Sequence, residues 1–299
     1  MRYRKVSHLY SLLNSSKSKR IESPLFESKE ISVDIKRDDL IHPILSGNKW
    51  RKLKHLLLYI ESLDAIAIQA LGGRYSNFLH SLSYVCHLLG WPLEIFVLGY
   101  PNQPETPMMS DAKAWGAKLT LVDKQTYRQL RERPFEYAKN VVWLPEGGFE
   151  ALATKGAAES IFELSHDYDY LITASATGTT IAGYCAAVAK YQLPTRILAV
   201  AVLKNDDEIM NNVIRLAGHA DNCQVIKGYE CGGFAKHNAE LERFIELATA
   251  EFSIPLEPVY SGKSFWALYD MIEKNRFPKG SRILYIHCGG MQGARDSCR

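Results

Sequence analysis

The sequence has no cysteine pattern typical of a metal or redox site and no hydrophobic run of membrane-spanning length. Its six cysteines form no Cys-x-x-Cys pair and no zinc-like spacing with histidine, which excludes the common zinc and dithiol motifs. A transmembrane helix needs about 20 predominantly apolar residues, and no tract approaches that length. We therefore expect reduced thiols, no metal, no membrane partner and a cytoplasmic location.

The chain also has little excess of one sign of charge over the other. The 36 Lys and Arg residues nearly balance the 33 Asp and Glu residues, and a net charge of +3 over 299 residues is too small to indicate nucleic acid as a partner. The basic stretch at residues 1–20 holds six Lys or Arg and no acidic residue. A transit peptide is the alternative there, but we expect a surface arm that precedes the core.

Short β-rich runs alternate with amphipathic helical stretches along most of the chain, which predicts an α/β fold built from βαβ units around open, mainly parallel twisted sheets. The expected strands cover residues 31–36, 65–70, 93–98, 119–122, 141–144, 170–174, 196–202 and 283–287. The expected helices cover residues 48–63, 75–89, 125–139, 150–165, 179–190, 206–217, 237–251 and 262–273, with one more before Gly116.

The most informative run is Ser-Gly-Asn-Lys-Trp-Arg-Lys-Leu at residues 46–53, which places Lys49 after a Gly-Asn turn at the start of a helix. The helix fixes the backbone while the amine is free to enter a cleft. If burial and neighbouring cations favour the neutral amine, Lys49 becomes a nucleophile that forms a Schiff base with an aldehyde cofactor. A solvated basic first turn is the alternative, and Lys52 is expected on another face of the helix.

A second motif of small residues and threonines spans residues 173–183, between an apolar strand and a helix. Backbone N–H groups and the positive end of a helix dipole suit a phosphate at this point of an open α/β sheet. The Gly-Lys-Ser/Thr step of a Walker loop is absent. Close packing with a helix N-cap explains the same residues, so both interpretations stay open.

A third motif, Gly-Gly-Arg-Tyr-Ser-Asn-Phe at residues 72–78, also follows a strand and opens a helix. Ser76 and Asn77 carry short polar side chains near exposed backbone donors, suited to a carboxylate or a phenolic oxygen. An ordinary N-cap is the alternative.

Six motifs in this order resemble one enzyme family. They are Lys-Arg-Asp-Asp-Leu (36–40), Gly-Asn-Lys-x-Arg-Lys-Leu (47–53), Gly-Gly-x-x-Ser-Asn (72–77), Thr-Gly-Thr-Thr (177–180), Val-Tyr-Ser-Gly-Lys-Ser (259–264) and His-Cys-Gly-Gly (287–290). The chain is similar over residues 23–293 to the pyridoxal-phosphate enzymes that comprise 1-aminocyclopropane-1-carboxylate deaminase and D-cysteine desulfhydrase. The resemblance implies the two-domain tryptophan-synthase-β-like fold (fold type II), with a discontinuous large cofactor-binding domain at residues 1–50 and 146–299 and a small inserted α/β domain at residues 51–145.

The resemblance also implies roles for individual residues. Lys49 looks like the Schiff-base lysine, and Asn77 looks like the partner of the cofactor's phenolic oxygen. Ser76 and Asn77 match the substrate-carboxylate end, Ser76 is a possible proton-transfer group, and Tyr260 matches a tyrosine that faces the substrate. The residues expected to hold the cofactor's phosphate and ring are Ala176, Thr177, Gly178, Thr179, Thr180 and Cys288.

Two positions bear on the substrate. In this resemblance the deaminases carry Glu and Leu where this chain has Ser261 and Cys288, and the D-cysteine desulfhydrases carry Ser and Thr. Cys288 is nearer to Thr in size and in having a hydrogen-bond donor. A small neutral group near the pyridine nitrogen stabilises its protonated form less than a carboxylate does. The pair therefore favours the desulfhydrase activity.

Other positions depart from the family pattern. Phe234 stands where relatives usually have a tyrosine, so a second active-site hydroxyl is missing, and Tyr75, Phe78 and Leu79 replace more polar residues. These changes imply a bulkier and more apolar substrate pocket, with Phe78 among the residues that contact the substrate.

The leading hypothesis is a lyase, dependent on pyridoxal 5'-phosphate, that converts D-cysteine to pyruvate, sulfide and ammonia. The alternatives are 1-aminocyclopropane-1-carboxylate deaminase and an amino-acid dehydratase or racemase. An alternative of another class is a non-catalytic metabolite-binding protein on the same fold. The resemblance implies a homodimer with a small amino acid as its substrate.

Overall fold

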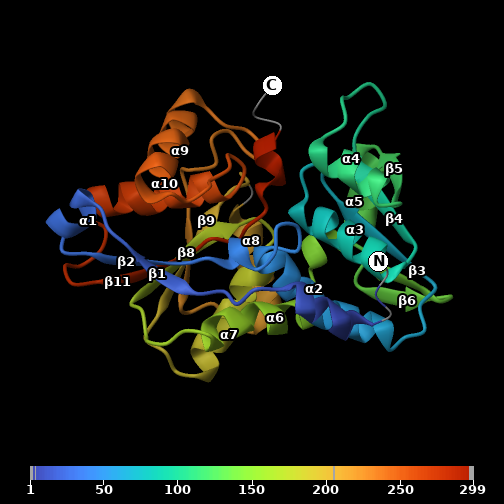
Figure 1. Cartoon of the computed structure of the whole chain (residues 1–299), viewed down its shortest axis with the longest axis horizontal. Helices are drawn as coiled ribbons and strands as arrows, with labels where there is room; N and C mark the ends of the chain where they lie inside the picture. Colours follow the sequence, from blue (N-terminus) through green and yellow to red (C-terminus); the bar gives the residue numbers. More distant parts are fainter. Residues whose placement is uncertain (1–2, 4, 205, 296–299) are drawn as a thin grey trace.

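The strands form two separate sheets, and the structure, a computed structural model, describes residues 3, 5–204 and 206–295 (Figure 1). The larger sheet has the order β1-β2-β11-β8-β9-β10. Its strands are β1 (Ser18–Ile21), β2 (Ser32–Lys36), β8 (Tyr170–Ser175), β9 (Arg196–Ala201), β10 (Cys223–Ile226) and β11 (Arg282–Ile286). All its pairings are parallel except β1 with β2 at one edge.

The smaller sheet has the order β5-β4-β3-β7-β6 and is parallel except for the edge strand β6. Its strands are β3 (Ala67–Gly72), β4 (Leu93–Leu98), β5 (Lys118–Val122), β6 (Glu136–Ala138) and β7 (Val141–Leu144). The expected α/β class with open, mainly parallel sheets is confirmed.

Helices cover both faces of the larger sheet, because alternate residues of its central strands are buried on opposite sides. Ile283 and Tyr285 of β11 pack into one cluster, with helices α1, α9 and α10, whereas Leu284 and Ile286 pack into the other, with α6, α7 and α8. These helices are α1 (Pro24–Ser28), α6 (Ala151–Phe162), α7 (Thr179–Lys190), α8 (Asp206–Ala217), α9 (Ala239–Phe252) and α10 (Ser261–Glu273).

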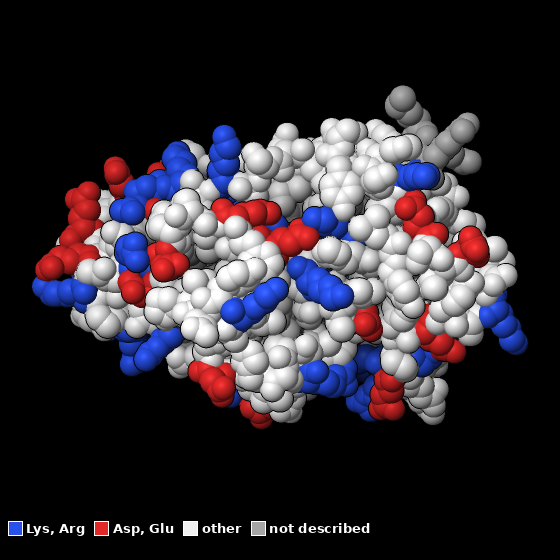
Figure 2. Space-filling view, turned by 90° about the horizontal axis from the view of Figure 1, so that it is seen from below, with Lys and Arg blue, Asp and Glu red and all other residues white. Residues whose placement is uncertain are grey.

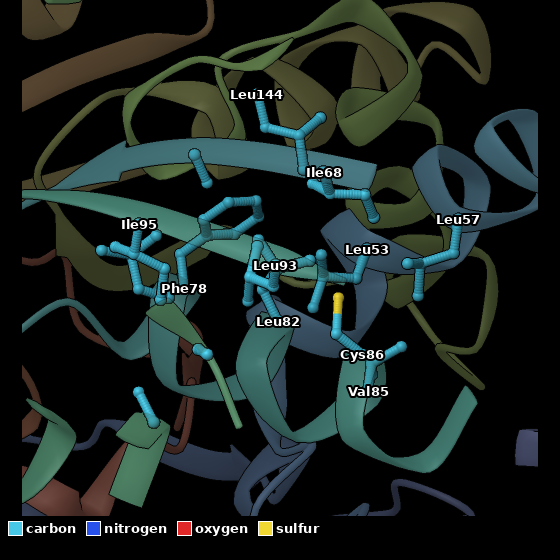
Figure 3. Packing of buried hydrophobic residues seen from close by; sticks show 14 of the residues in the cluster. Leu53, Leu57, Ile68, Phe78, Leu82, Val85, Cys86, Leu93, Ile95 and Leu144 are labelled. Carbon is cyan, nitrogen blue, oxygen red and sulfur yellow. The ribbon is translucent and has the colours of Figure 1, made fainter. Parts of the chain in front are cut away.

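The smaller sheet is covered in the same way. Helices α2 (Gly47–Glu61), α3 (Asn77–Leu89) and α4 (Pro107–Ala114) bury one face, and α5 (Lys124–Arg131) covers the other. Figure 3 shows Leu82, Val85 and Cys86 of α3 on one side of Leu53 of α2, with Ile68 of β3 on the other side. Helix α2 thereby packs against the core of the smaller sheet while its first turn, which carries Lys49, lies near the larger one.

The N-terminal segment differs from the expected surface arm. A 3₁₀ helix, η1 (Val6–Leu12), buries Val6 and Leu9 completely in the core of the smaller sheet, and the backbone N–H of Val6 donates to Glu61 Oε1 at 2.7 Å. The expectation was wrong because it rested on the basic charge of residues 1–20 and did not consider that two apolar residues among them, Val6 and Leu9, could be buried. Residues 1–50 were expected to belong to the large domain, but η1 packs against the smaller sheet. The domain boundaries at residues 50/51 and 145/146 stay a prediction.

One expected helix was too long. Helix α5 ends at Arg131, not at residue 139, because Pro134 disfavours helical backbone in the residue before it and residues 136–138 pair with β7 as an edge strand. The sequence pattern also missed β1, β10 and α1, which are short.

No helix among the described residues is long and apolar enough to cross a membrane. The cysteines described are free thiols, and Cys298 lies outside the described residues. On the face seen in Figure 2, basic and acidic side chains are interspersed rather than gathered by sign.

Candidate active site

The carboxyl ends of strands from both sheets meet at a cleft of about 450 Å³. This volume is typical of a small-molecule site, and ligands of open α/β sheets bind outside the carboxyl ends of the strands. The expected site residues that line the cleft are Lys49, Ser76, Asn77, Phe78, Ala176, Thr177, Gly178, Thr179, Thr180, Tyr260 and Cys288. Ser261 is buried next to Tyr260 but is not part of the cleft wall.

The start of α2 positions Lys49. Gly47 has a φ of +61°, and a Cβ at this position would lie 1.7 Å from the carbonyl oxygen of Cys288, so only glycine lets the two segments approach. Lys49 Nζ lies 5.6 Å from the centroid of the Tyr260 ring and donates to Asn48 Oδ1. Burial lowers the pKa of Lys49, although Cys288 and Glu257 oppose this shift. The fold therefore favours the neutral, nucleophilic amine.

Lys52 lines the cleft, so the expectation that it lies on another face of the helix from Lys49 is wrong. It lies on the same face of α2 as Lys49, since residues three apart on a helix are neighbours. Its amine is buried and donates to the carbonyl oxygen of Gly147 at 3.0 Å. Burial, together with the protonated form of Lys49, lowers the pKa of Lys52 to about 7. A second amine is thus available in the cleft for an anion.

The turn between β8 and α7 has the features of a phosphate site. Gly178 has a φ of +80°, and a Cβ there would lie 2.8 Å from the carbonyl oxygen of Ile209. The first residues of α7, Thr179 and Thr180, line the cleft, and the backbone N–H groups at a helix N-terminus have no partner within the helix. Ser175 adds a buried hydroxyl that lines the cleft and has no hydrogen-bond partner among the described residues. An anion with several acceptor oxygens fits this turn.

Side chains from other elements hold the turn in place. Asn212 Nδ2 donates to the carbonyl oxygen of Thr177 at 3.1 Å, and the hydroxyls of Thr177 and Thr179 are 3.2 Å apart. Asn48 Nδ2 donates to Thr180 Oγ1 at 2.9 Å, which ties the residue before Lys49 to the first turn of α7.

At the start of α3, Ser76 and Asn77 have different surroundings. Ser76 Oγ accepts from the backbone N–H of Leu79 at 3.3 Å, so Ser76 is an N-cap as well as a cleft residue. Asn77 Oδ1 accepts from Gln292 Nε2 at 2.9 Å, which orients the amide. A Cβ on Gly290 would lie 2.2 Å from Asn77 Nδ2, so the Gly-Gly pair of the last motif makes room for this side chain.

Glu257 is another residue that the sequence analysis missed. Its carboxylate is completely buried and accepts from the backbone N–H groups of Val259, Tyr260 and Ser261 at 2.7–2.8 Å. Burial raises the pKa of Glu257 despite these bonds. Ser261 Oγ lies 3.3 Å from Glu257 Oε1, so the serine is part of this cap at the start of α10.

Two further side chains face the cleft. Tyr260 packs edge to face with Phe234, with ring centroids 5.9 Å apart, and burial raises the pKa of its hydroxyl, which is therefore protonated at neutral pH. Cys288 Sγ lies 3.2 Å from Thr173 Oγ1, and burial raises the pKa of this thiol as well. Cys288 is therefore a neutral group beside Lys49.

A buried lysine of α10 holds the loop that carries Phe234. The amine of Lys263 is completely buried and donates to the carbonyl oxygens of Glu230 at 2.8 Å and Gly233 at 2.9 Å. Phe78 is buried under Gly148. The rings of Phe78 and Phe234 thus form the apolar side of the pocket that was expected. Leu79 packs in the core of the smaller sheet and does not line the cleft.

Helix α5 supplies a row of polar cleft residues that no motif indicated: Lys124, Tyr127, Arg128 and Arg131. Their spacing of three and four residues places them on one helix face, which was the available signal. Tyr127 Oη donates to Glu146 Oε1 at 2.7 Å, and Arg131 Nε donates to Glu146 Oε2 at 2.7 Å. This side of the cleft is polar, in contrast to the expected apolar pocket.

Comparison with known proteins decides the class of this cleft. Residues 18–289 match the family model of the pyridoxal-phosphate dependent enzymes. The chain belongs to this family. Pyridoxal phosphate is therefore its cofactor, and the chain is an enzyme of the tryptophan-synthase-β-like fold, as the six motifs predicted.

Within this family, the chain is similar to two named enzymes and to one solved structure. The chain is 27% identical to the bifunctional D-cysteine desulfhydrase/1-aminocyclopropane-1-carboxylate deaminase of Arabidopsis thaliana, over 88% of this chain and 73% of the plant protein. It is 24% identical to 1-aminocyclopropane-1-carboxylate deaminase of Mesorhizobium japonicum, over 87% of each chain. A crystal structure of a homologue of that deaminase superposes with a TM-score of 0.77 at 22% identity, covering 98% of this chain and 96% of the other.

Proposed function

We propose that the protein is a lyase that uses pyridoxal phosphate and cleaves a small amino acid, with D-cysteine as the leading substrate. The observation that carries the proposal is the partly buried Lys49 amine, which shares one cleft with the anion-binding turn after β8. The names of the plant and bacterial relatives support desulfhydrase and deaminase chemistry.

We assign the cofactor to this cleft. Lys49 would hold it covalently. The turn at residues 175–180 and the amine of Lys52 would hold its phosphate, and Asn77 and Cys288 would contact its ring. When bound, the cofactor supplies an electron sink for the negative charge that develops on the substrate α-carbon.

The protein's own groups would bind the substrate and move protons. Backbone donors at the start of α3, next to Ser76 and Asn77, suit the substrate carboxylate. When its amine is free of the cofactor, Lys49 Nζ, whose pKa is lowered by burial, would take the α-proton. Tyr260 keeps its proton and can donate to the substrate, and Ser76, whose Oγ accepts from the Leu79 backbone N–H, retains its own O–H as a possible proton-transfer group. The rings of Phe78 and Phe234 exclude water from one side.

Ser261 and Cys288 direct the choice between the two named activities. We expect a higher kcat/KM for sulfide release from D-cysteine than for ammonia release from 1-aminocyclopropane-1-carboxylate. In the variant Ser261→Glu/Cys288→Leu, a carboxylate and a larger apolar group replace two small neutral ones, and the first activity should fall. Wild-type protein with the higher kcat/KM on the cyclopropane substrate would refute this preference and favour the deaminase.

Further features of the account stay proposals. We propose a homodimer, as the family resemblance implies, which light scattering would test. We also propose a cytoplasmic location, because the cysteines form no disulfide or metal motif, although the Arabidopsis relative is named as mitochondrial. We also retain the division into a large domain (1–50 and 146–299) and a small inserted domain (51–145), which limited proteolysis would test.

A further inference from the structure

Helix α5 forms the outer wall of the cleft on the side of the smaller sheet. Asp123 caps its first turn by accepting from the backbone N–H of Thr126 at 2.8 Å, and the Tyr127 ring is buried in the cluster under the sheet. The helix is therefore held with Lys124, Arg128 and Arg131 along its cleft face.

These three cations differ in their partners. Arg131 is neutralised, because it forms ion pairs with Glu146 at 2.7 Å and with Glu208. In the part of the chain that the structure describes, Glu146 is the one acidic side chain that lines the cleft, and it also accepts from Tyr127. Within residues 3, 5–204 and 206–295, no hydrogen bond or ion pair engages the charged ends of Lys124 or Arg128.

Neither part of the proposed chemistry uses these two charges. Lys52 and the N-terminus of α7 serve the cofactor phosphate, and the start of α3 serves the substrate carboxylate. Two solvent-exposed cations, without partners among the described residues, remain at the wall of a concave site, where field lines concentrate and raise the attraction for an anion. A neutral amino acid such as D-cysteine or the cyclopropane substrate leaves both charges without a counter-charge.

We propose that Lys124 and Arg128 select an amino acid whose side chain carries a second negative group, such as a carboxylate. The inference rests on the proposed lyase activity and names, for the same site, a charged substrate class that would be preferred over D-cysteine. The reaction is the same elimination, on a substrate whose negative group is attached through a sulfur on the β-carbon: the α-proton is removed, the bond from the β-carbon to sulfur breaks, and the thiolate that carries the negative group leaves with the electron pair and takes up a proton. Water then converts the remaining enamine to pyruvate and ammonia.

The test uses two ligands of nearly equal shape, S-carboxymethylcysteine and its neutral amide S-carbamoylmethylcysteine, each as the D- and the L-enantiomer. Binding to the cofactor-loaded protein is followed by the change in visible absorbance. We expect the carboxylate to bind about tenfold more tightly than the amide at low ionic strength, with the difference shrinking in 0.5 M salt (about a 4 Å screening length).

The variant Lys124→Gln/Arg128→Gln should reduce this ratio to within about twofold. The control Lys19→Gln/Lys155→Gln removes the same charge from exposed positions outside the cleft and should preserve the ratio. Equal binding of carboxylate and amide to wild-type protein, or an unchanged ratio in the cleft variant, would overturn the inference.

Pyruvate release separates this inference from the proposed function. Preferential binding of the carboxylate without pyruvate from any amino acid would refute the lyase and support the selectivity. Equal kcat/KM for carboxylate and amide, with pyruvate formed from both, would support the lyase and refute the selectivity. No change in absorbance with any ligand would contradict both.

Discussion

Arg51 holds the carboxylate of Asp38 by two hydrogen bonds, from Nε to Oδ2 at 2.6 Å and from Nη2 to Oδ1 at 2.8 Å. Both side chains are buried, and Arg51 also donates to Glu163 on the far side. Since Arg51 follows Lys49 by two residues, this pair fixes the first turn of α2 against the end of β2 and thereby the origin of the Lys49 side chain.

Asp38→Asn should destabilise the protein by about 3–5 kcal/mol, because it leaves the buried guanidinium of Arg51 without its main counter-charge. Denaturant unfolding of the cofactor-free protein measures the loss. The matched control is Ser160→Ala, which removes only the hydroxyl that donates to Asp38 at 3.2 Å and should cost about 1 kcal/mol. Equal losses in the two variants would show that the ion pair is not what holds the helix.

Gly47→Ala tests the close approach of α2 to the last motif. The new methyl would collide with the Cys288 carbonyl group, so we expect a loss of at least about 3 kcal/mol or failure to fold. Gly280→Ala is the control, since Gly280 has a φ of +80° and open space around it; its cost should be about 1 kcal/mol. Similar unfolding free energies for both variants would contradict the steric account.

Sequence patterns predicted most of this fold because its central strands are continuous apolar runs and its helices are amphipathic. They failed at β1 and β10, which are four-residue strands at the two edges of the larger sheet, and at η1, whose burial of Val6 depends on a surface supplied by residues far along the chain.

The site was predictable to the extent that local motifs determine it. Lys49 and the turn at residues 175–180 each follow a local start signal, and both line the cleft. Lys52 and Glu257 were missed, because their roles depend on the carbonyl of Gly147 and on the backbone donors of α10, which only the folded chain brings into reach. The spacing of the polar residues of α5 indicated that they share one helix face, but no local pattern indicated that this face lines the cleft.

Binding of sulfate to the cofactor-free protein should weaken as pH rises through 7. Lys52 has its pKa lowered to about 7, so its amine is charged below that pH and becomes neutral above it, and only the charged amine attracts a dianion. We expect affinity about tenfold lower at pH 8.5 than at pH 6.5, measured by calorimetry.

Lys52→Gln should abolish this pH dependence. Lys54→Gln should retain it, because Lys54 lies on the same helix but pairs with Glu159 outside the cleft. Wild-type affinity that does not change with pH, or a Lys52→Gln variant that keeps the wild-type profile, would place the phosphate elsewhere.

The variant Thr177→Val/Thr180→Val should retain the cofactor less well. Each hydroxyl that bonds a phosphate contributes roughly 1.5–3 kcal/mol as a charge-assisted hydrogen bond. Titration of the cofactor-free protein, followed by visible absorbance, measures the affinity. Thr195→Val removes a buried hydroxyl that donates to the carbonyl oxygen of Tyr168, away from the cleft, and should leave cofactor affinity unchanged. Unaltered affinity in the double variant would remove these threonines from the phosphate site.

The central claim is that Lys49, and not the neighbouring Lys52, carries the cofactor. Lys49→Ala should lack both turnover and the visible absorbance of the bound cofactor, because the Lys52 amine is held by Gly147 and Arg51 cannot replace an amine. The most direct measurement is borohydride reduction of the cofactor-loaded wild-type protein, followed by peptide mass spectrometry, which fixes the cofactor to its lysine. The account predicts modification of Lys49, and modification of Lys52 or of any lysine outside the cleft would contradict it.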